Sequence, residues 1–288
     1  IFSIGRISSR MAPGLYSATA AMLLLAASPW FVGYAVFLRP YGMALGIGLL
    51  TTWLVLEIHA PLVSAGRQRW LRVGFVVLSG LGLYTLYHYA FVLAWQMLGL
   101  LVFAWNREPR RRYLVAWVVM GFGIVLVFAP WIPRLLSHLA ASTSLGYYFV
   151  GWPTSGDWLP GLGHLLLVFA LGEGLWSTWA GTLRLAAVLL GVITLPCILI
   201  SLRSGSMRNL DPISRVLWLM LPVLPVMILA SDWVRDTHTI LLSKTNFMFL
   251  PVGILLIVRS AYAFSSRRGS LAMVLAWSVI FFSATVLA

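Results

Sequence analysis

The sequence predicts an all-α polytopic membrane protein with about nine transmembrane helices and a large extracytoplasmic loop. Three observations lead to this prediction. The chain is 61% hydrophobic and 9% charged, and its mean hydropathy of +0.94 is outside the range of soluble domains. Its apolar residues form runs of about membrane length. Its arginines cluster in every second gap between those runs. We interpret residues 1–288 as a single transmembrane domain.

The apolar runs are each about long enough to cross a hydrocarbon core, which needs about 20 predominantly apolar residues. In chain order, the runs are Ala12–Val32, Tyr41–Ile58, Val73–Tyr87, Tyr89–Trp105, Leu114–Trp131, Leu183–Leu202, Val216–Ala230, Phe247–Phe264 and Leu271–Ala288.

The first residues resemble the tail of an earlier helix, and no signal peptide precedes them, so we expect the sequence to be a fragment that lacks residues at its start.

The positive charges are divided unequally between the two sides of the predicted membrane. One further arginine, Arg259, lies inside a run. Fourteen basic residues lie on one side of the predicted membrane and five on the other. By the positive-inside rule, the side with fourteen is the cytoplasmic side of the inner (plasma) membrane, and the opposite face is the active, extracytoplasmic one. Fourteen basic residues share the first side, namely Arg6, Arg10, Arg67, Arg69, Arg72, Arg107, Arg110, Arg111, Arg112, Arg203, Arg208, Arg215, Arg267 and Arg268. The second side has five, namely Arg39, Arg134, Arg184, Arg235 and Lys244.

The excess of basic residues does not indicate a nucleic-acid partner. The net charge is +13, but it lies in short loops beside predicted spans, where it serves as a topology signal and contacts anionic membrane lipids. Cys197 is the only cysteine and lies inside an apolar run. An intrachain disulfide and a zinc site built on cysteines are therefore excluded.

Residues 133–183 are expected to form an extracytoplasmic loop within the transmembrane domain. Its apolar segment Gly161–Leu171 is too short to span comfortably. If that segment crossed, the later arginine clusters would move to the outer side and the charge bias would disappear. The loop is also rich in tyrosine and tryptophan, which concentrate at membrane interfaces. We therefore expect it to lie on the membrane, as a lid or a binding surface.

The predicted outer face carries several candidate polar residues. The densest cluster is Asp232–His238, whose two carboxylates and histidine can bind a divalent cation, or can form a solvated loop with an ion pair to Arg235. His88 lies in a hairpin between two runs and either makes interfacial hydrogen bonds or holds a phosphate or sugar hydroxyl. Arg39 precedes Pro40 at a predicted helix start, which favours an anionic group. The alternative is an arginine that snorkels.

Three segments together resemble a known family. The first is Leu25–Phe31, with its Ser-Pro pair, followed by the Arg-Pro-Tyr step in Arg39–Met43. The second is the Gly-Leu-Tyr-Thr-Leu-Tyr-His-Tyr hairpin in Leu81–Phe91, with Gln96. The third is the Pro-Trp-Ile-Pro helix end in Phe128–Pro133. Their order resembles bacterial integral-membrane glycosyltransferases of the C superfamily, which include relatives of protein O-mannosyltransferases and lipid A aminoarabinose transferases.

The resemblance implies transfer of a sugar from a polyprenyl-phosphate-linked donor to a lipid, glycan or protein acceptor on the extracytoplasmic face. Basic side chains would hold the phosphate as it leaves, and a carboxylate would deprotonate the acceptor hydroxyl. Near Lys244, Thr245 and Asn246 stand where many relatives have an Arg-Tyr pair, which departs from the family pattern. The expected substrate-binding residues are Arg39, Tyr41, His88, Tyr89, Arg134, Asp232, Arg235 and Lys244.

The sequence assigns no catalytic base, no metal ligand and no cofactor, and a divalent cation has no clear site. In the family, the base is a carboxylate in the first outer loop. The first outer loop here, Trp30–Arg39, has no Asp or Glu. We therefore expect the base upstream of Ile1. The competing interpretation takes it from a later acid: Asp157, Glu173, Asp232 or Asp236.

Two other classes remain open. A transporter or flippase for a lipid-linked or amphiphilic substrate predicts charged residues near the membrane midplane and paired broken helices. The runs here are nearly free of charge and the polar residues gather at one face, which favours chemistry at the outer face. A structural partner subunit is the third interpretation.

Overall fold

The computed structural model describes residues 1–11, 16–36, 40–60, 63–142, 188–194, 196–197, 210–221, 223–235, 250–261 and 267–287. These residues are almost all helical and include no strand, so the all-α prediction is confirmed for this part of the chain. The chain divides into two compact units. The first contains Ile1–Gly42, Leu159–Asp211 and Phe249–Ala288, and the second contains Met43–Trp158 and Pro212–Met248.

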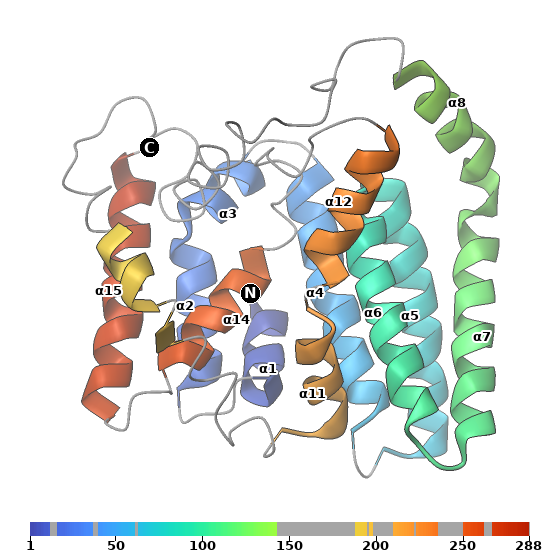
Figure 1. Ribbon diagram of the computed structural model, residues 1–288, viewed down its shortest axis with the longest axis horizontal. Coiled ribbons are helices and arrows are strands. Elements are labelled where there is room, and N and C mark those ends of the chain that lie inside the picture. The colour runs from blue at the N-terminus through green and yellow to red at the C-terminus, as the bar shows by residue number, and fades with distance from the viewer. Residues whose placement is uncertain are drawn as a thin grey trace. The chain divides into compact units, whose positions relative to one another are not determined.

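The first unit is organised around α2, which packs against α1, α14 and α15 and also contacts α3, the next helix along the chain (Figure 1). Two side chains tie together parts that are distant in the sequence. Arg259 Nη1 donates a hydrogen bond to the carbonyl oxygen of Met11 at the end of α1, at 3.0 Å. Trp277 Nε1 donates to Thr194 Oγ1, also at 3.0 Å. The helices of this unit are α1 (Phe2–Met11), α2 (Ser17–Ala27), α3 (Pro29–Val36), α14 (Leu250–Ala261) and α15 (Arg267–Leu287).

A break at Ser28 divides the apolar run that was predicted as one span, Ala12–Val32, into α2 and α3. Ser28 has φ −66° and ψ 119°, an extended conformation, because a following proline disfavours the helical region. Its Oγ accepts a hydrogen bond from the Phe31 amide at 3.3 Å. Ser28 therefore caps α3, and Pro29 occupies the first helical position, where no amide donor is needed.

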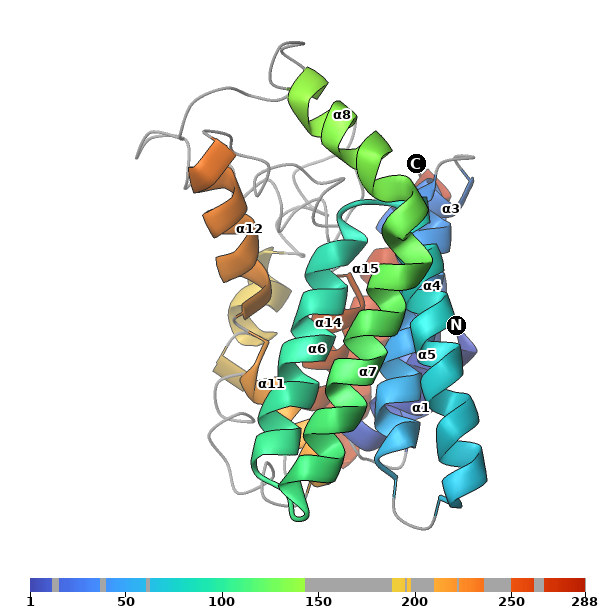
Figure 2. The same ribbon diagram turned by 90° about the vertical axis from the view of Figure 1, so that its right-hand side faces the viewer.

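The second unit contains antiparallel neighbours whose bounds follow the predicted runs closely (Figures 1 and 2). The run predicted at Val216–Ala230 is instead two helices, α11 and α12, with a turn at Met220 and Leu221. Pro222 and Pro225 follow that turn and cannot donate amide hydrogen bonds. The helices are α4 (Pro40–Ile58), which starts in the last residues of the first unit, α5 (Ala65–Thr85), α6 (Tyr89–Trp105), α7 (Arg110–Phe128), η1 (Ala129–Trp131), α8 (Ile132–Ser142), α11 (Pro212–Leu219) and α12 (Val223–Arg235).

Glycines allow α5 to approach its neighbours closely. A Cβ atom at Gly80 would overlap Val127 of α7, and a Cβ atom at Gly123 of α7 would lie 3.0 Å from Val76 Cγ1 of α5. On each helix, a glycine therefore leaves room for a valine side chain of the other helix. Such contacts between small residues are a principal source of helix association in membranes.

A buried polar cluster joins α4 to α6. Gln96 Nε2 donates to Thr52 Oγ1 at 2.8 Å and lies 3.0 Å from Thr51 Oγ1. Thr51 Oγ1 and Tyr89 OH share a hydrogen bond at 2.9 Å. These side chains are all buried. The cluster explains why polar residues stand inside apolar helices: each one satisfies a partner on the facing helix.

We expect Gln96→Leu to destabilise the protein only modestly, by about 1–2 kcal/mol, because an interhelical hydrogen bond in a membrane contributes about 0.6 kcal/mol on average. Thr51 and Thr52 keep hydrogen bonds to the Gly48 carbonyl, at 3.1 and 2.7 Å. Thermal unfolding of the purified protein measures the loss. Thr52→Val should lower the free energy of unfolding less in the Gln96→Leu background than in the parent protein. Strictly additive losses would show that the two side chains are not coupled.

Among the described residues, two helical stretches are long and apolar enough to cross a membrane, judged by length and composition: α4 and the continuous stretch Arg110–Ser137. The apolar window of α4 is 61% buried, as it would be in the core of a soluble protein, whereas that of Arg110–Ser137 is only 17% buried. These stretches support membrane association weakly, and they do not establish nine spans.

Candidate functional site at the aromatic end of the second unit

The second unit has two chemically different ends. At one end, α5 and α7 begin and α6 finishes, and seven arginines gather there; we name this the arginine end. At the opposite end, the aromatic end, lie the α5–α6 turn, the start of α8 and the last turn of α12 (Figures 1 and 2). The charge pattern of the sequence predicts such an arrangement. The seven are Arg67, Arg69, Arg72, Arg107, Arg110, Arg111 and Arg112.

Four aromatic residues meet at the aromatic end, and we name them the aromatic cluster: Tyr84, Tyr87, Phe128 and Trp131. The Tyr84 ring stands edge-to-face against Phe128 and Trp131, with ring centroids 5.4 and 5.7 Å apart. The Tyr84 hydroxyl donates to the Val127 carbonyl at 3.0 Å. Trp131 Nε1 donates to the Tyr87 hydroxyl at 3.1 Å. The α5–α6 turn is thereby tied to the end of α7.

Local sequence explains why these residues meet. Tyr84 lies in the last turn of α5, where its hydroxyl reaches the Val127 carbonyl near the end of α7. Pro130 and Pro133 have no amide donor, and the chain passes from α7 through the 3₁₀ turn η1 into α8. α8 consequently leans away from the axis of α7 (Figure 2).

α8 has an amphipathic sequence. Ile132, Leu135, Leu136 and Leu139 recur at the spacing of one helical face. Arg134 lies off that apolar stripe, is exposed, and follows Trp131 by three residues, about one helical turn. The Arg134 side chain therefore leaves α8 about one turn beyond Trp131, on the face opposite the apolar stripe.

The predicted site residues in the α5–α6 hairpin have different environments. His88 is the residue before α6, and its ring centroid lies 6.2 Å from that of Phe91. Tyr89 is fully buried, and its ring packs over Gly82 of α5. The position of Tyr89 thus gives it a structural role between α4 and α5. Tyr41 is partly exposed in the first turn of α4.

The remaining predicted site residues are described only in part. Asp232 lies in the last turn of α12 and is 1% exposed. Trp233 beside it is 73% exposed, a feature of this end that the sequence prediction did not include. Arg235 ends α12, but its side chain lies outside the described residues, as do Arg39 and Lys244 entirely. Within the described part of the chain, no group of three metal-ligating side chains comes together, and Asp236 and His238 fall outside that part.

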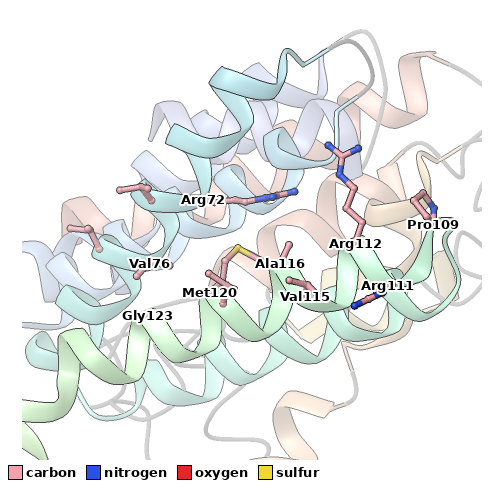
Figure 3. A pocket seen from close by; sticks show the side chains of 12 residues that line it. Arg72, Val76, Pro109, Arg111, Arg112, Val115, Ala116, Met120 and Gly123 are labelled. Atoms are coloured by element: carbon pink, nitrogen blue, oxygen red, sulfur yellow. The ribbon is translucent and has the colours of Figure 1, made fainter.

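A second feature, an apolar groove, lies between α5 and α7 at the arginine end and has a volume of about 830 Å³ (Figure 3). Burial, and secondly the charge of Arg112, lower the pKa of the Arg72 guanidinium, which lies just before the predicted span Val73–Tyr87. The sequence prediction used these arginines only for topology. The feature of the sequence that could have predicted the groove is the set of valines that follow these arginines at spacings of three and four residues. The groove is lined by Arg72, Val73, Val76, Val77, Pro109, Arg111, Arg112, Val115, Ala116, Val119, Met120 and Gly123.

Comparison of the chain with protein-family models, with curated proteins and with solved structures finds no match.

Proposed function

We propose that the chain is a polytopic membrane glycosyltransferase that uses a polyprenyl-phosphate-linked sugar at the extracytoplasmic face of the plasma membrane. The observation that carries this proposal is the aromatic cluster. It joins Tyr84 and Tyr87 of the predicted hairpin to Trp131 of the predicted Pro-Trp-Ile-Pro helix end, through one edge-to-face contact and one hydrogen bond. Two of the three segments that resemble the family are thus one surface.

The outward faces of α5 and α7 support the placement in a membrane. Large apolar side chains on these faces are about half or more exposed, and a contiguous exposed apolar surface is uncommon on soluble monomers. In a membrane the same side chains contact lipid tails, and helix association then depends on close glycine contacts such as those at Gly80 and Gly123. The exposed residues include Val73, Val115, Val118, Val119, Phe122, Val125 and Leu126.

The chemistry of the aromatic end suits a lipid-linked sugar phosphate. Aromatic rings offer flat apolar faces with polar edges, on which a sugar ring or a prenyl chain can stack. Arg134 would hold the phosphate by charge-assisted hydrogen bonds as that group leaves with the lipid. α8 would lie in the interface, with its apolar stripe against the lipid. Water is excluded from a site covered in this way.

The direct test is an activity measurement. Membranes that contain the full protein are incubated with radiolabelled polyprenyl-phosphate sugars, and label is followed into lipid, glycan and protein fractions. Transfer above that of membranes lacking the protein is the expected result. Absence of transfer with every donor tested, from protein shown to be folded, would refute the proposal.

The proposed nine-span topology makes a separate prediction about the two ends of α7. In a Cys197→Ser background, Ser137→Cys on α8 should react with an impermeant maleimide added to intact cells. Glu108→Cys in the α6–α7 turn should react only after the membrane is opened, because the arginine end faces the cytoplasm. The measurement is labelling before and after permeabilisation. Reaction of both positions in intact cells would contradict a crossing by α7.

A transporter or flippase is the second candidate function, and a specific observation favours it. Two apolar segments are interrupted at prolines, α2–α3 at Ser28-Pro29 and α11–α12 at Met220–Pro222. Interrupted helices at corresponding places are typical of transporters. The test uses purified protein in vesicles with a fluorescent lipid-linked sugar. Movement of this lipid between leaflets without cleavage of the sugar–phosphate bond would favour a transporter over the enzyme.

A further inference from the structure

The groove between α5 and α7 combines two chemistries along its length. Arg72 on α5 and Arg112 on α7 approach it from its two walls near one end (Figure 3). Farther along, its walls are formed by side chains such as Val76, Val119 and Met120 and by Gly123. The groove is therefore cationic at one end and apolar along the rest, which matches an amphiphile with an anionic head.

An unsatisfied donor marks the cationic part. The Nε atom of Arg72 is buried and makes no hydrogen bond to any described residue. Buried polar groups nearly always have a partner, so this donor is available to a bound anion. A second guanidinium, that of Arg112, lies close enough to repel the first. A phosphate oxygen would accept from Arg72 and neutralise both charges.

We propose that this groove binds an anionic glycerophospholipid of the leaflet at the arginine end, with its phosphate between Arg72, Arg111 and Arg112 and an acyl chain along the valines of α5 and α7. The inference rests on the membrane placement proposed above. It is independent of sugar transfer, because the groove lies at the arginine end and the aromatic cluster at the opposite end of the same helices.

The length of the groove selects a lipid over a soluble phosphate. From Arg111 to Gly123, α7 rises by about 18 Å, at about 1.5 Å per residue. Half of a hydrocarbon core of about 30 Å is about 15 Å. The whole groove, from the guanidinium groups at the level of the phosphates to Gly123, thus has about the depth of one leaflet. A free phosphate would leave the apolar walls without a partner.

The test measures lipid selection by the full chain in vesicles of phosphatidylcholine that contain a few per cent of spin-labelled phosphatidylglycerol or spin-labelled phosphatidylcholine. The immobilised fraction of each probe gives its relative affinity. We expect the protein to prefer phosphatidylglycerol. Each of Arg72→Gln and Arg112→Gln should reduce that preference by about fivefold, and the double variant by about 25-fold, because one arginine contributes a factor of this size near an anionic surface.

A matched control and a groove-filling variant separate a site from a general surface charge. Arg110→Gln removes an arginine of the same end that stacks on Trp105 and does not line the groove, so the preference should persist. Ala116→Phe fills the groove without changing charge and should reduce the immobilised fraction. Arg72→Lys keeps the positive charge and serves as the folded reference. It should retain part of the preference for phosphatidylglycerol.

Each outcome decides one point. Equal losses in Arg110→Gln and Arg72→Gln, or an unchanged preference in the double variant, would overturn the site. Full competition by soluble glycerol phosphate would show a phosphate site in place of a lipid site. Release of the chain from vesicles by alkaline carbonate would instead refute the membrane placement on which both proposals depend.

Discussion

Replacing Trp131 by alanine is expected to lower sugar transfer by roughly 30-fold or more. The substitution removes the indole ring that contacts Tyr84 at a centroid distance of 5.7 Å and the donor to the Tyr87 hydroxyl. Tryptophan side chains at recognition sites commonly contribute on the order of 2 kcal/mol or more, and every 1.36 kcal/mol in the barrier changes the rate about tenfold. The measurement is kcat/KM for a radiolabelled polyprenyl-phosphate sugar in membranes.

The matched control is Trp105→Ala, because Trp105 is also exposed and lies at the opposite, arginine end, where Arg110 stacks on it. Its transfer rate should stay within about threefold of the parent, a change of under ~1 kcal/mol. Trp131→Phe keeps an aromatic ring but removes the donor of the Trp131–Tyr87 hydrogen bond. Tyr87→Phe keeps a ring and removes the acceptor of the same bond. Their double variant should be no worse than either one. Equal losses for Trp131→Ala and Trp105→Ala would show that tryptophan acts through the membrane interface and not through the aromatic cluster.

The helix ends that the sequence predicts best are those at polar turns. The α5–α6 and α6–α7 turns fall at Leu86–His88 and Asn106–Pro109, where polar residues and a proline interrupt long apolar runs. The run predicted at Tyr89–Trp105 therefore agrees with α6, and the run predicted at Val73–Tyr87 agrees with the end of α5, which begins earlier, at Ala65. Hydrophobic length and charge are local properties, and they can be read without knowing what packs against them.

Breaks inside apolar runs are harder to predict from hydropathy. Ser28-Pro29 and Met220–Pro222 are within stretches that are apolar throughout, so composition alone gives continuous spans. The signal that marks them is the proline chemistry: the residue before a proline avoids the helical region, and a proline has no amide donor. Whether a proline ends a helix or only bends it depends on neighbours that can satisfy the released carbonyls.

The sequence indicates which segments resemble the family, but it does not indicate which of their side chains meet. The structure brings Tyr84 and Tyr87 of the hairpin together with Trp131 of the Pro-Trp-Ile-Pro end. Tyr89 in the same hairpin is instead buried between helices. Adjacent tyrosines point in different directions around a turn. Which one faces the surface depends on a tertiary feature, the absence of a side chain at Gly82 that lets the Tyr89 ring lie against α5.

That same contact gives the structural substitution with the largest expected effect, Gly82→Ala. A Cβ atom there would lie 2.6 to 2.8 Å from three atoms of the Tyr89 ring. The ring is fully buried and its hydroxyl is hydrogen-bonded to Thr51, so it has little room to move. Overpacking of this kind costs about 1–3 kcal/mol. We expect the substitution to lower the thermal stability of the purified protein and to loosen the α5–α6 turn that carries Tyr84 and Tyr87.

Gly46→Ala in α4 is the control for Gly82→Ala, because a Cβ atom at Gly46 has no heavy atom of the described structure within 4 Å. This helical substitution should be neutral or stabilise the protein by up to about 1 kcal/mol, since alanine favours helix more than glycine does. Tyr89→Ala costs stability alone but should remove the penalty of Gly82→Ala, so that the double variant is less destabilised than the sum of the two single changes. Additive losses, or equal effects of alanine at Gly46 and Gly82, would mean that Tyr89 does not pack on Gly82.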